Sequence, residues 1–251
     1  MMGCLLAVLL IGALFQGAIL LGFGVRSVPA EAAWMAVAAG IAFLLANVGL
    51  YFSFARGPVR LVTPIIACFS VISVGIAILE GASLTTGHAI AIGTLMLGIA
   101  IVGFATPQDN QTFPPVGPSI AFALLAAFGF AATFKLGQLA AETSGDIEAT
   151  VISRLTAFGL LGTFLLIRAR PVLPGRRALL PLVTMGVLDS LAIFSVISAA
   201  PLPNPEYAAV ATSTFGLLTI VLAWGLLKEA MSMRQWIGCL MTFTAVGYLA
   251  L

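Results

Sequence analysis

The sequence predicts an all-α membrane protein, a polytopic bundle of transmembrane helices. Hydrophobic residues make up 61% of the 251 residues and charged residues 8%, with a mean hydropathy of +1.16. These values lie far outside the usual range for soluble domains. Nine apolar stretches of about 17 to 25 residues fill nearly the whole chain. Helices of that length cross a hydrocarbon core roughly 30 Å thick and satisfy their own backbone hydrogen bonds there.

The nine predicted helices follow one another with short connections. They cover residues 1–23, 32–54, 61–79, 88–105, 117–141, 149–168, 178–199, 207–227 and 235–251. The first stretch is predicted as a helix rather than a cleaved signal peptide, because no Lys or Arg precedes it and it is longer than a signal core of about 7–15 residues. The longest connections, 106–116 and 169–177, have no room for a nucleotide-binding module, so gradients must drive any transport.

The sequence predicts no cofactor, no metal site and no nucleic-acid partner. Cys4, Cys68 and Cys239 all lie inside apolar stretches, where a free thiol behaves as a small hydrophobic group. His88 is the only histidine, and no second ligand stands at metal-binding spacing from it. Since no nucleophile, base and metal ligand cluster along the chain, we do not expect an enzyme.

The order of the apolar stretches indicates an internal duplication. A shift of 149 residues places Thr63 on Thr212, Glu80 on Glu229 and Ser83 on Ser232, and leaves 117–141 without a partner. The predicted organisation is therefore a four-helix repeat over 1–105, a linker over 106–116 and a five-helix repeat over 117–251. A repeat with an odd number of helices reverses direction when duplicated, which gives the inverted halves typical of secondary transporters. We expect the first repeat to lack its first helix, either truly or because an upstream in-frame start encodes it.

Several motifs resemble those of a known family. The first half has Leu50-Tyr-Phe-Ser-Phe-Ala-Arg-Gly-Pro58, then Pro64 in a helix that ends at Glu80. The second half has Ser153-Arg-Leu-Thr-Ala157, the helix from Ala208 to Glu229, and Ser232 followed by Gln235-Trp-Ile-Gly238. In order and spacing these motifs are similar to those of the drug/metabolite transporter superfamily, EamA type.

This resemblance covers practically the whole chain. It implies a bundle of ten helices in two repeats that exports or imports small metabolites. The chain departs from the pattern because the first helix is missing and Leu5 stands at the position equivalent to Arg154.

Charge bias and resemblance give opposite orientations. Connections on the side of the N-terminus carry Arg56, Arg60, Arg168, Arg170, Arg176, Arg177, Lys228 and Arg234. The other side has Arg26, together with Lys135 and Arg154 if these two are counted there. Since Lys and Arg in short connections favour the cytoplasm, the bias predicts a cytoplasmic N-terminus and an external C-terminus. The resemblance implies a cytoplasmic C-terminus instead.

Three charged side chains fall inside predicted helices, where each requires a physical reason. Asp189 lies about eleven residues into its helix, near the midplane, and Lys135 and Arg154 lie about six residues from the opposite face. The depth difference is only about 6 Å, which a long side chain spans along its helix. An ion pair of Asp189 with either cation is therefore feasible. Two interpretations stay open: Asp189 binds a proton or a cationic group of the substrate, or the pair only fixes the packing of helices.

Uncharged polar residues supply further candidates for substrate binding or coupling. Gln138 shares a helix face with Lys135, and Asn47 and Tyr51 are four residues apart on another face. Thr212 and Ser213 belong to a polar run that serves either a cavity or helix packing. Glu80 and Glu229 end their helices, and we expect Ser83 and Ser232 to cap the helices that follow.

The predicted function is secondary transport of small metabolites by alternating access, for amino-acid, nucleoside or drug-like solutes. We expect a multi-pass protein of a bacterial plasma membrane that acts as a monomer or homodimer, with the lipid bilayer around it and possible coupling to protons. The alternative is a non-transporting membrane subunit or an inactive truncated paralogue, which the missing first helix suggests.

The charge bias makes a direct prediction about Leu251. A C-terminal alkaline phosphatase fusion should be active, because the bias places this end outside the cell. A C-terminal fluorescent reporter that matures only in the cytoplasm should stay dark. Bright fluorescence with an inactive phosphatase would show that the topology implied by the resemblance outweighs the Lys and Arg bias.

Overall fold

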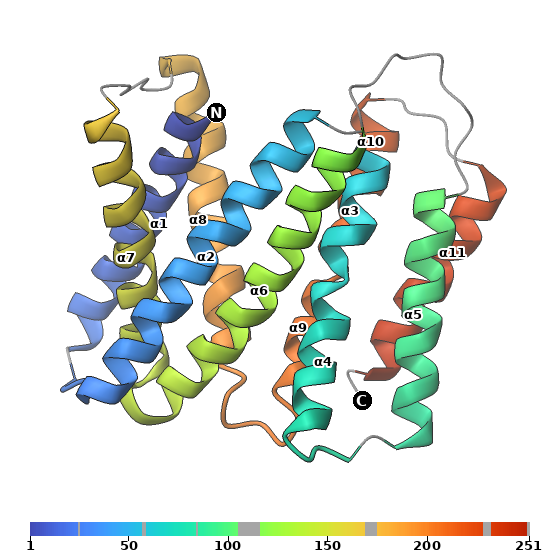
Figure 1. The fold of residues 1–251 in the computed structure, drawn as a ribbon, viewed down its shortest axis with the longest axis horizontal. Helices are drawn as coiled ribbons and strands as arrows, with labels where there is room; N and C mark the ends of the chain where they lie inside the picture. Colours follow the sequence, from blue (N-terminus) through green and yellow to red (C-terminus); the bar gives the residue numbers. More distant parts are fainter. Residues whose placement is uncertain are drawn as a thin grey trace. The chain divides into compact units, whose positions relative to one another are not determined.

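The computed structural model describes residues 1–24, 26–56, 59–83, 85–104, 116–168, 175–227 and 232–249, and in these it shows helices and no strand. Figure 1 shows them as a helical protein. The helices are α1 (Met2–Phe23), α2 (Ala30–Arg56), α3 (Val59–Ala67), α4 (Phe69–Leu79), α5 (Thr86–Phe104), α6 (Val116–Ser144), α7 (Asp146–Ile167), the 3-10 turn η1 (Arg176–Ala178), α8 (Leu179–Ile197), α9 (Glu206–Thr212), α10 (Phe215–Leu227) and α11 (Met233–Leu249). Arg170, Lys228, Glu229, Leu251 and nearly all of the predicted linker lie outside the described residues.

The predicted all-α membrane fold is confirmed, and every predicted helix is found with its ends within three residues of the prediction. Five of these helices are long and apolar enough to cross a membrane. Two shorter apolar segments are Ile65–Leu79, which covers the end of α3 and all of α4, and Thr86–Ile101 in α5. The protein is therefore an integral, multi-pass membrane protein.

Two of the predicted helices, over 61–79 and 207–227, are each divided into two shorter helices. The prediction that they are continuous was wrong. The first divides into α3 and α4 at Cys68, whose N–H bonds the Ile65 carbonyl three residues back. The second divides into α9 and α10 at Ser213 and Thr214, whose hydroxyls also donate to carbonyls three residues back. Such bonds tighten a turn in competition with the regular helical ladder.

The helices form two compact units, and each unit takes residues from both halves of the chain. Unit 1 comprises Met1–Asn47 and Ala132–Pro205, and unit 2 comprises Val48–Ala131 and Glu206–Leu251. Helices α2 and α6 each contribute one end to unit 1 and the other to unit 2. The compact units therefore differ from the two sequence repeats, which remain a prediction.

In unit 1, α1 packs against both α7 and α8. Glycine makes the close approaches possible, because a Cβ at Gly186 would lie 2.8 Å from Ile11 Cγ2 and one at Gly40 would lie 2.7 Å from Thr156 Cβ. Leu5, Leu9, Phe43 and Ile197 are almost fully buried in this unit.

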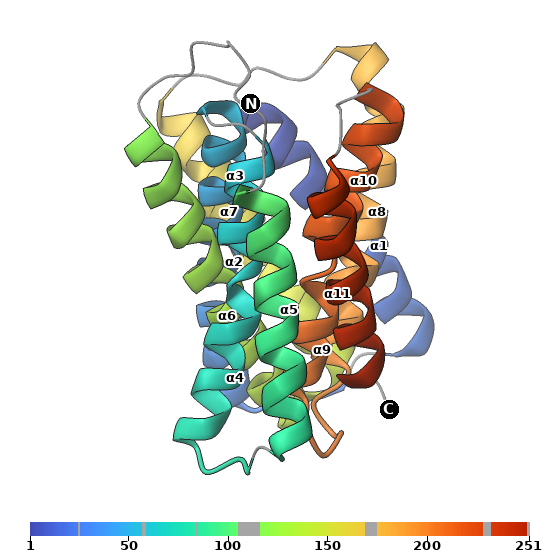
Figure 2. The ribbon, with the colours of Figure 1, turned by 90° about the vertical axis from the view of Figure 1, so that its right-hand side faces the viewer.

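In unit 2, α5 packs along α11, and the two lie side by side in both views (Figures 1 and 2). Their backbones meet at Gly98, where a Cβ would lie 2.7 Å from the Gly238 carbonyl oxygen. Small residues at such contacts bring membrane helices close enough for dispersion to hold them together. A buried apolar cluster around Leu95 and Val210 continues this core to α9.

The predicted caps are half right. Ser232 caps α11: its Oγ accepts from the Gln235 N–H at 3.3 Å, and Gln235 Oε1 accepts from the Ser232 N–H at 2.7 Å. This reciprocal pair is a capping box. The cap of α5 is Thr85 rather than Ser83, because the Thr85 hydroxyl accepts from the His88 N–H. The helix begins at Thr86, and so Ser83 stands too far upstream to reach its first free N–H groups.

The α5 and α11 contact predicts opposite outcomes for two glycines of one helix. Gly98→Ala should destabilise the protein by about 1 to 3 kcal/mol, because the nearest backbone of α11 cannot move aside as a flexible side chain would. Gly93→Ala is the matched control, since nothing lies within 4 Å of a Cβ there. Thermal unfolding in detergent should show a lower Tm for Gly98→Ala alone. Equal Tm values for the two variants would contradict this account of the contact.

Candidate functional site

An ion pair inside unit 1 joins α7 to α8. Arg154 Nη2 donates to Asp189 Oδ2 at 2.7 Å. The predicted pairing of Asp189 with a cation is confirmed for Arg154. Because α7 begins three residues earlier than predicted, Arg154 lies eight residues into the helix, roughly 12 Å from its start. Asp189 lies ten residues into α8, roughly 15 Å from its start.

The two partners differ in accessibility. The Arg154 side chain is 1% exposed, whereas the Asp189 side chain is 32% exposed. The guanidinium is therefore enclosed by protein, whereas about a third of the carboxylate side chain is not covered by protein. Removing one partner of such a pair would leave an enclosed charge uncompensated, at a cost of several kcal/mol.

Three helices enclose the guanidinium of Arg154. Its Cζ lies 5.2 Å from the ring centre of Phe43 on α2, a cation–π contact. On α1, a Cβ at Gly12 would clash with Arg154 Nη1 and lie 2.6 Å from Ser190 Oγ of α8. Only glycine at position 12 leaves room for the guanidinium. One turn further along α1, Gln16 Nε2 donates to the Ser190 carbonyl at 3.0 Å.

The polar groups around the pair are not fully hydrogen-bonded. Among the described residues, Arg154 Nε, Arg154 Nη1 and Gln16 Oε1 are buried with no hydrogen-bond partner. Each such atom loses its hydrogen bonds to water and forms no other hydrogen bond in their place. This arrangement of α1, α7 and α8 therefore holds polar groups that a different packing, or a bound molecule, would satisfy.

The other predicted candidates on α6 occupy a different part of unit 1. Gln138 is buried, and its Nε2 donates to the Val196 and Pro205 carbonyls at 3.0 and 3.1 Å. It thereby satisfies backbone acceptors at and beyond the end of α8. Lys135 is half-buried and lies nine residues before the end of α6, deeper than predicted, because the helix extends to Ser144.

The remaining candidates hydrogen-bond to their own helices or lie apart. Asn47 Nδ2 donates to the Phe43 carbonyl at 2.9 Å, and Tyr51 is half-buried one turn later on α2. Thr212 Oγ1 donates to the Ala208 carbonyl at 2.8 Å and Ser213 Oγ to the Val210 carbonyl at 2.6 Å. Asn47 belongs to unit 1, whereas Tyr51, Thr212 and Ser213 belong to unit 2.

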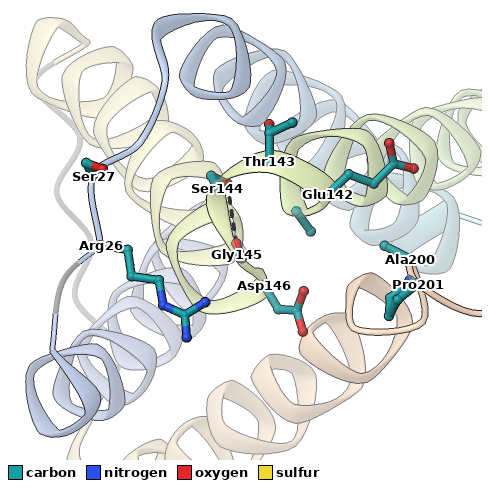
Figure 3. A pocket seen from close by; sticks show the side chains of 10 residues that line it. Arg26, Ser27, Glu142, Thr143, Ser144, Gly145, Asp146, Ala200 and Pro201 are labelled. Carbon is teal, nitrogen blue, oxygen red and sulfur yellow. Dashed lines mark hydrogen bonds between the residues drawn. The ribbon is translucent and has the colours of Figure 1, made fainter.

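A cavity of about 730 Å³ opens at the end of unit 1 where α6 turns into α7 (Figure 3). Its walls come from the α1–α2 connection, from the end of α6 with the turn into α7, and from the residues that follow α8. They comprise Arg26, Ser27, Ala141, Glu142, Thr143, Ser144, Gly145, Asp146, Ala200 and Pro201. The sharp turn depends on Gly145, whose φ of 93° favours glycine. Glu148 fixes the opposite wall, since its buried carboxylate accepts from the Arg26 backbone N–H at 3.1 Å.

Sequence reasoning missed Gly12, Phe43 and this cavity. Gly12 precedes the polar residue Gln16 by four positions and so shares its helix face, which was an available signal. No local pattern indicates Phe43, because its contact with Arg154 is tertiary. The cavity is equally tertiary, since its walls are distant in the sequence.

Comparison with known proteins agrees with the all-helical membrane fold. Residues 117–251, more than half of the chain, match the EamA-like transporter family. The chain belongs to this family. The family is part of the drug/metabolite transporter superfamily, as the motifs had indicated, and its members are membrane transporters of small molecules.

A solved structure supports the fold over nearly the whole chain. It is titled only "Crystal structure of protein", has a TM-score of 0.77 and 18% sequence identity, and the match covers 99% of this chain and 89% of that one. No curated protein matches the sequence. At this identity the solved structure is informative about the fold alone.

The enclosure of Arg154 predicts a specific role for Gly12. Gly12→Ala should destabilise unit 1 by about 1 to 3 kcal/mol, because the buried guanidinium and Ser190 have little room to move away from the new methyl group. Gly17→Ala on the same helix is the control, with nothing within 4 Å of its Cβ. Thermal unfolding in detergent measures both. A Gly12→Ala protein as stable as the control would show that the guanidinium has space elsewhere.

Proposed function

We propose that this EamA-like protein is a secondary transporter that moves a small metabolite by alternating access, with the Arg154–Asp189 pair as its coupling centre. The solute is amino-acid-like, nucleoside-like or drug-like, and a proton gradient supplies the energy. We place the protein in a bacterial plasma membrane as a monomer or homodimer. Two inverted repeats, 1–105 and 117–251, would provide the two exchanging states.

The observation that carries this proposal is the unequal exposure of the pair. Arg154 is enclosed by α1, α2 and α8, and the Asp189 side chain is 32% exposed, which supports a role of Asp189 as the group that binds a proton or solute. A proton or a cationic group that binds Asp189 neutralises the charge that balances Arg154. The guanidinium, which already has unsatisfied donors, then gains from any repacking that gives it a new acceptor. Binding at Asp189 would in this way favour a second arrangement of α1, α7 and α8.

Gln138, Asn47, Thr212 and Ser213 have a secondary place in this proposal. Each of them donates to backbone carbonyls within its own unit, which supports a role in holding helix ends and turns. Lys135 and Tyr51 are half-buried and remain candidates for contact with the solute.

The test is solute-driven proton movement in proteoliposomes that enclose a pH-sensitive dye. A panel of amino acids, nucleosides and cationic drugs should include solutes that move protons through the wild-type protein. Asp189→Asn retains the shape of the side chain but removes its charge, so it should reduce this coupled movement by about tenfold or more, equivalent to at least about 1.4 kcal/mol.

The control is Arg177→Gln, a change on the 3-10 turn η1 before α8 that should leave coupled movement unchanged. Normal proton coupling in a folded Asp189→Asn protein would contradict the role of Asp189. Absence of flux for every solute with the wild-type protein would instead favour the alternative, a non-transporting membrane subunit.

A further inference from the structure

We propose that the cavity at the α6–α7 turn is a binding site for an amino acid with a basic side chain, a solute with one carboxylate and two ammonium groups. This inference rests on the proposed function and assigns it a substrate class and a point of entry. The cavity of about 730 Å³ lies within the range of roughly 300 to 1,000 Å³ that is usual for small-molecule sites.

Three charged side chains line this cavity: Arg26, Glu142 and Asp146. Within the part of the chain that the structure describes, none of the three forms an ion pair. Figure 3 shows Arg26 on one side of the cavity, Glu142 on the other and Asp146 between them. One positive and two negative groups therefore stand around a single space, each with hydrogen-bonding capacity to offer a ligand.

The protein fixes the position of the positive group. The Arg26 backbone N–H donates to the buried Glu148 carboxylate, which anchors the α1–α2 connection to the first turn of α7. Arg26 Nη1 then lies 3.9 Å from the place where Gly145 would carry a Cβ, and Glu148 Oε2 lies 2.6 Å from the same place. The missing side chain at Gly145 makes room for both groups at the turn. Arg26 is thus held at the cavity by its backbone, and its guanidinium lies close over Gly145.

Charge complementarity selects the ligand class. The lining sums to one net negative charge, because Arg26 contributes one positive charge and Glu142 and Asp146 two negative charges. The Glu148 carboxylate at Gly145 is buried, accepts from the Arg26 backbone N–H and does not line the cavity, so it is not offered to a ligand. A dicarboxylate would meet two like charges, and a simple amine would offer no anionic group to the Arg26 guanidinium. A basic amino acid places its carboxylate on Arg26 and its two ammonium groups on Glu142 and Asp146, which pairs each of the three charged side chains of the lining with an opposite charge.

The cavity also lies at the right end of unit 1 for entry. Asp146 begins α7, and Arg154 follows eight residues later on the same helix, roughly 12 Å deeper. Ala200 and Pro201 line the cavity shortly after the end of α8, which carries Asp189. A cationic solute collected in the cavity therefore starts from the end of the two helices that hold the coupling pair.

The experiment measures binding of radiolabelled L-lysine to the full chain in lipid nanodiscs. Two competitors each lack one group of lysine: L-norleucine has no side-chain ammonium, and 1,5-diaminopentane has no carboxylate. Lysine should bind saturably, and each competitor should bind about fivefold more weakly, the scale of one partly exposed ion pair. Absence of saturable lysine binding to folded protein, or equal competition by norleucine, would overturn the proposal.

Variants assign the groups to their partners. Arg26→Gln should weaken lysine binding about fivefold and leave binding of 1,5-diaminopentane unchanged or stronger, whereas Asp146→Asn should weaken both. Arg177→Gln is the control, because it removes the same charge away from the cavity. A merely unfolded Arg26→Gln protein would lose diaminopentane binding too, and wild-type lysine affinity in that variant would refute the assignment.

Binding and transport fail separately in this design. Lysine binding without any solute-driven flux would leave the cavity assignment intact and refute the transporter proposal. Flux of other solutes without lysine binding would support the transporter proposal and refute the cavity assignment.

Discussion

The cost of keeping the Arg154 charge inside an apolar bundle constrains most of unit 1. The guanidinium cannot reach water, so α8 must supply a carboxylate, α2 an aromatic face and α1 a residue without a side chain. Asp189, Phe43 and Gly12 meet these three requirements from three different helices. The ion pair remains incompletely satisfied, because two nitrogens of Arg154 have no partner among the described residues. The pair therefore stabilises the packing of the helices, but the unsatisfied nitrogens of Arg154 would gain hydrogen bonds in a different arrangement.

Unit 2 shows a different way of holding membrane helices together. The contact between α5 and α11 depends on backbones that approach at Gly98 and Gly238, with no ion pair among the described residues there. Its two interrupted spans, α3–α4 and α9–α10, turn at hydroxyl and thiol residues. Broken spans of this kind expose backbone groups, which transporters use where a cavity or another helix can receive them. Unit 1 therefore concentrates charge, and unit 2 concentrates irregular backbone.

Local rules were sufficient for the existence of the helices and for a cation at the depth of Asp189, but they did not decide between Arg154 and Lys135. Stretch length decides whether a helix spans a bilayer, and the depths of Asp189 and Arg154 follow from counting residues along their helices. The interruption at Ser213 was harder to predict from the sequence, since Ser and Thr occur in many unbroken membrane helices. Phe43 and the cavity at Gly145 depend on which helices lie together, and no local pattern contains that information. The predicted cap of α5 was wrong by two residues, because Thr85 and not Ser83 lies close enough to accept a hydrogen bond from the His88 N–H.

The central claim is that the Arg154–Asp189 pair couples binding to movement and does more than stabilise the fold. The measurement that separates these roles is the stability and solute-driven proton flux of the double variant Arg154→Gln/Asp189→Asn. Because the double variant removes both charges together, it leaves no enclosed charge uncompensated, so it should fold with a Tm near that of the wild type. We predict that it folds but moves no protons with solute. A double variant that folds and transports like the wild type would contradict the account.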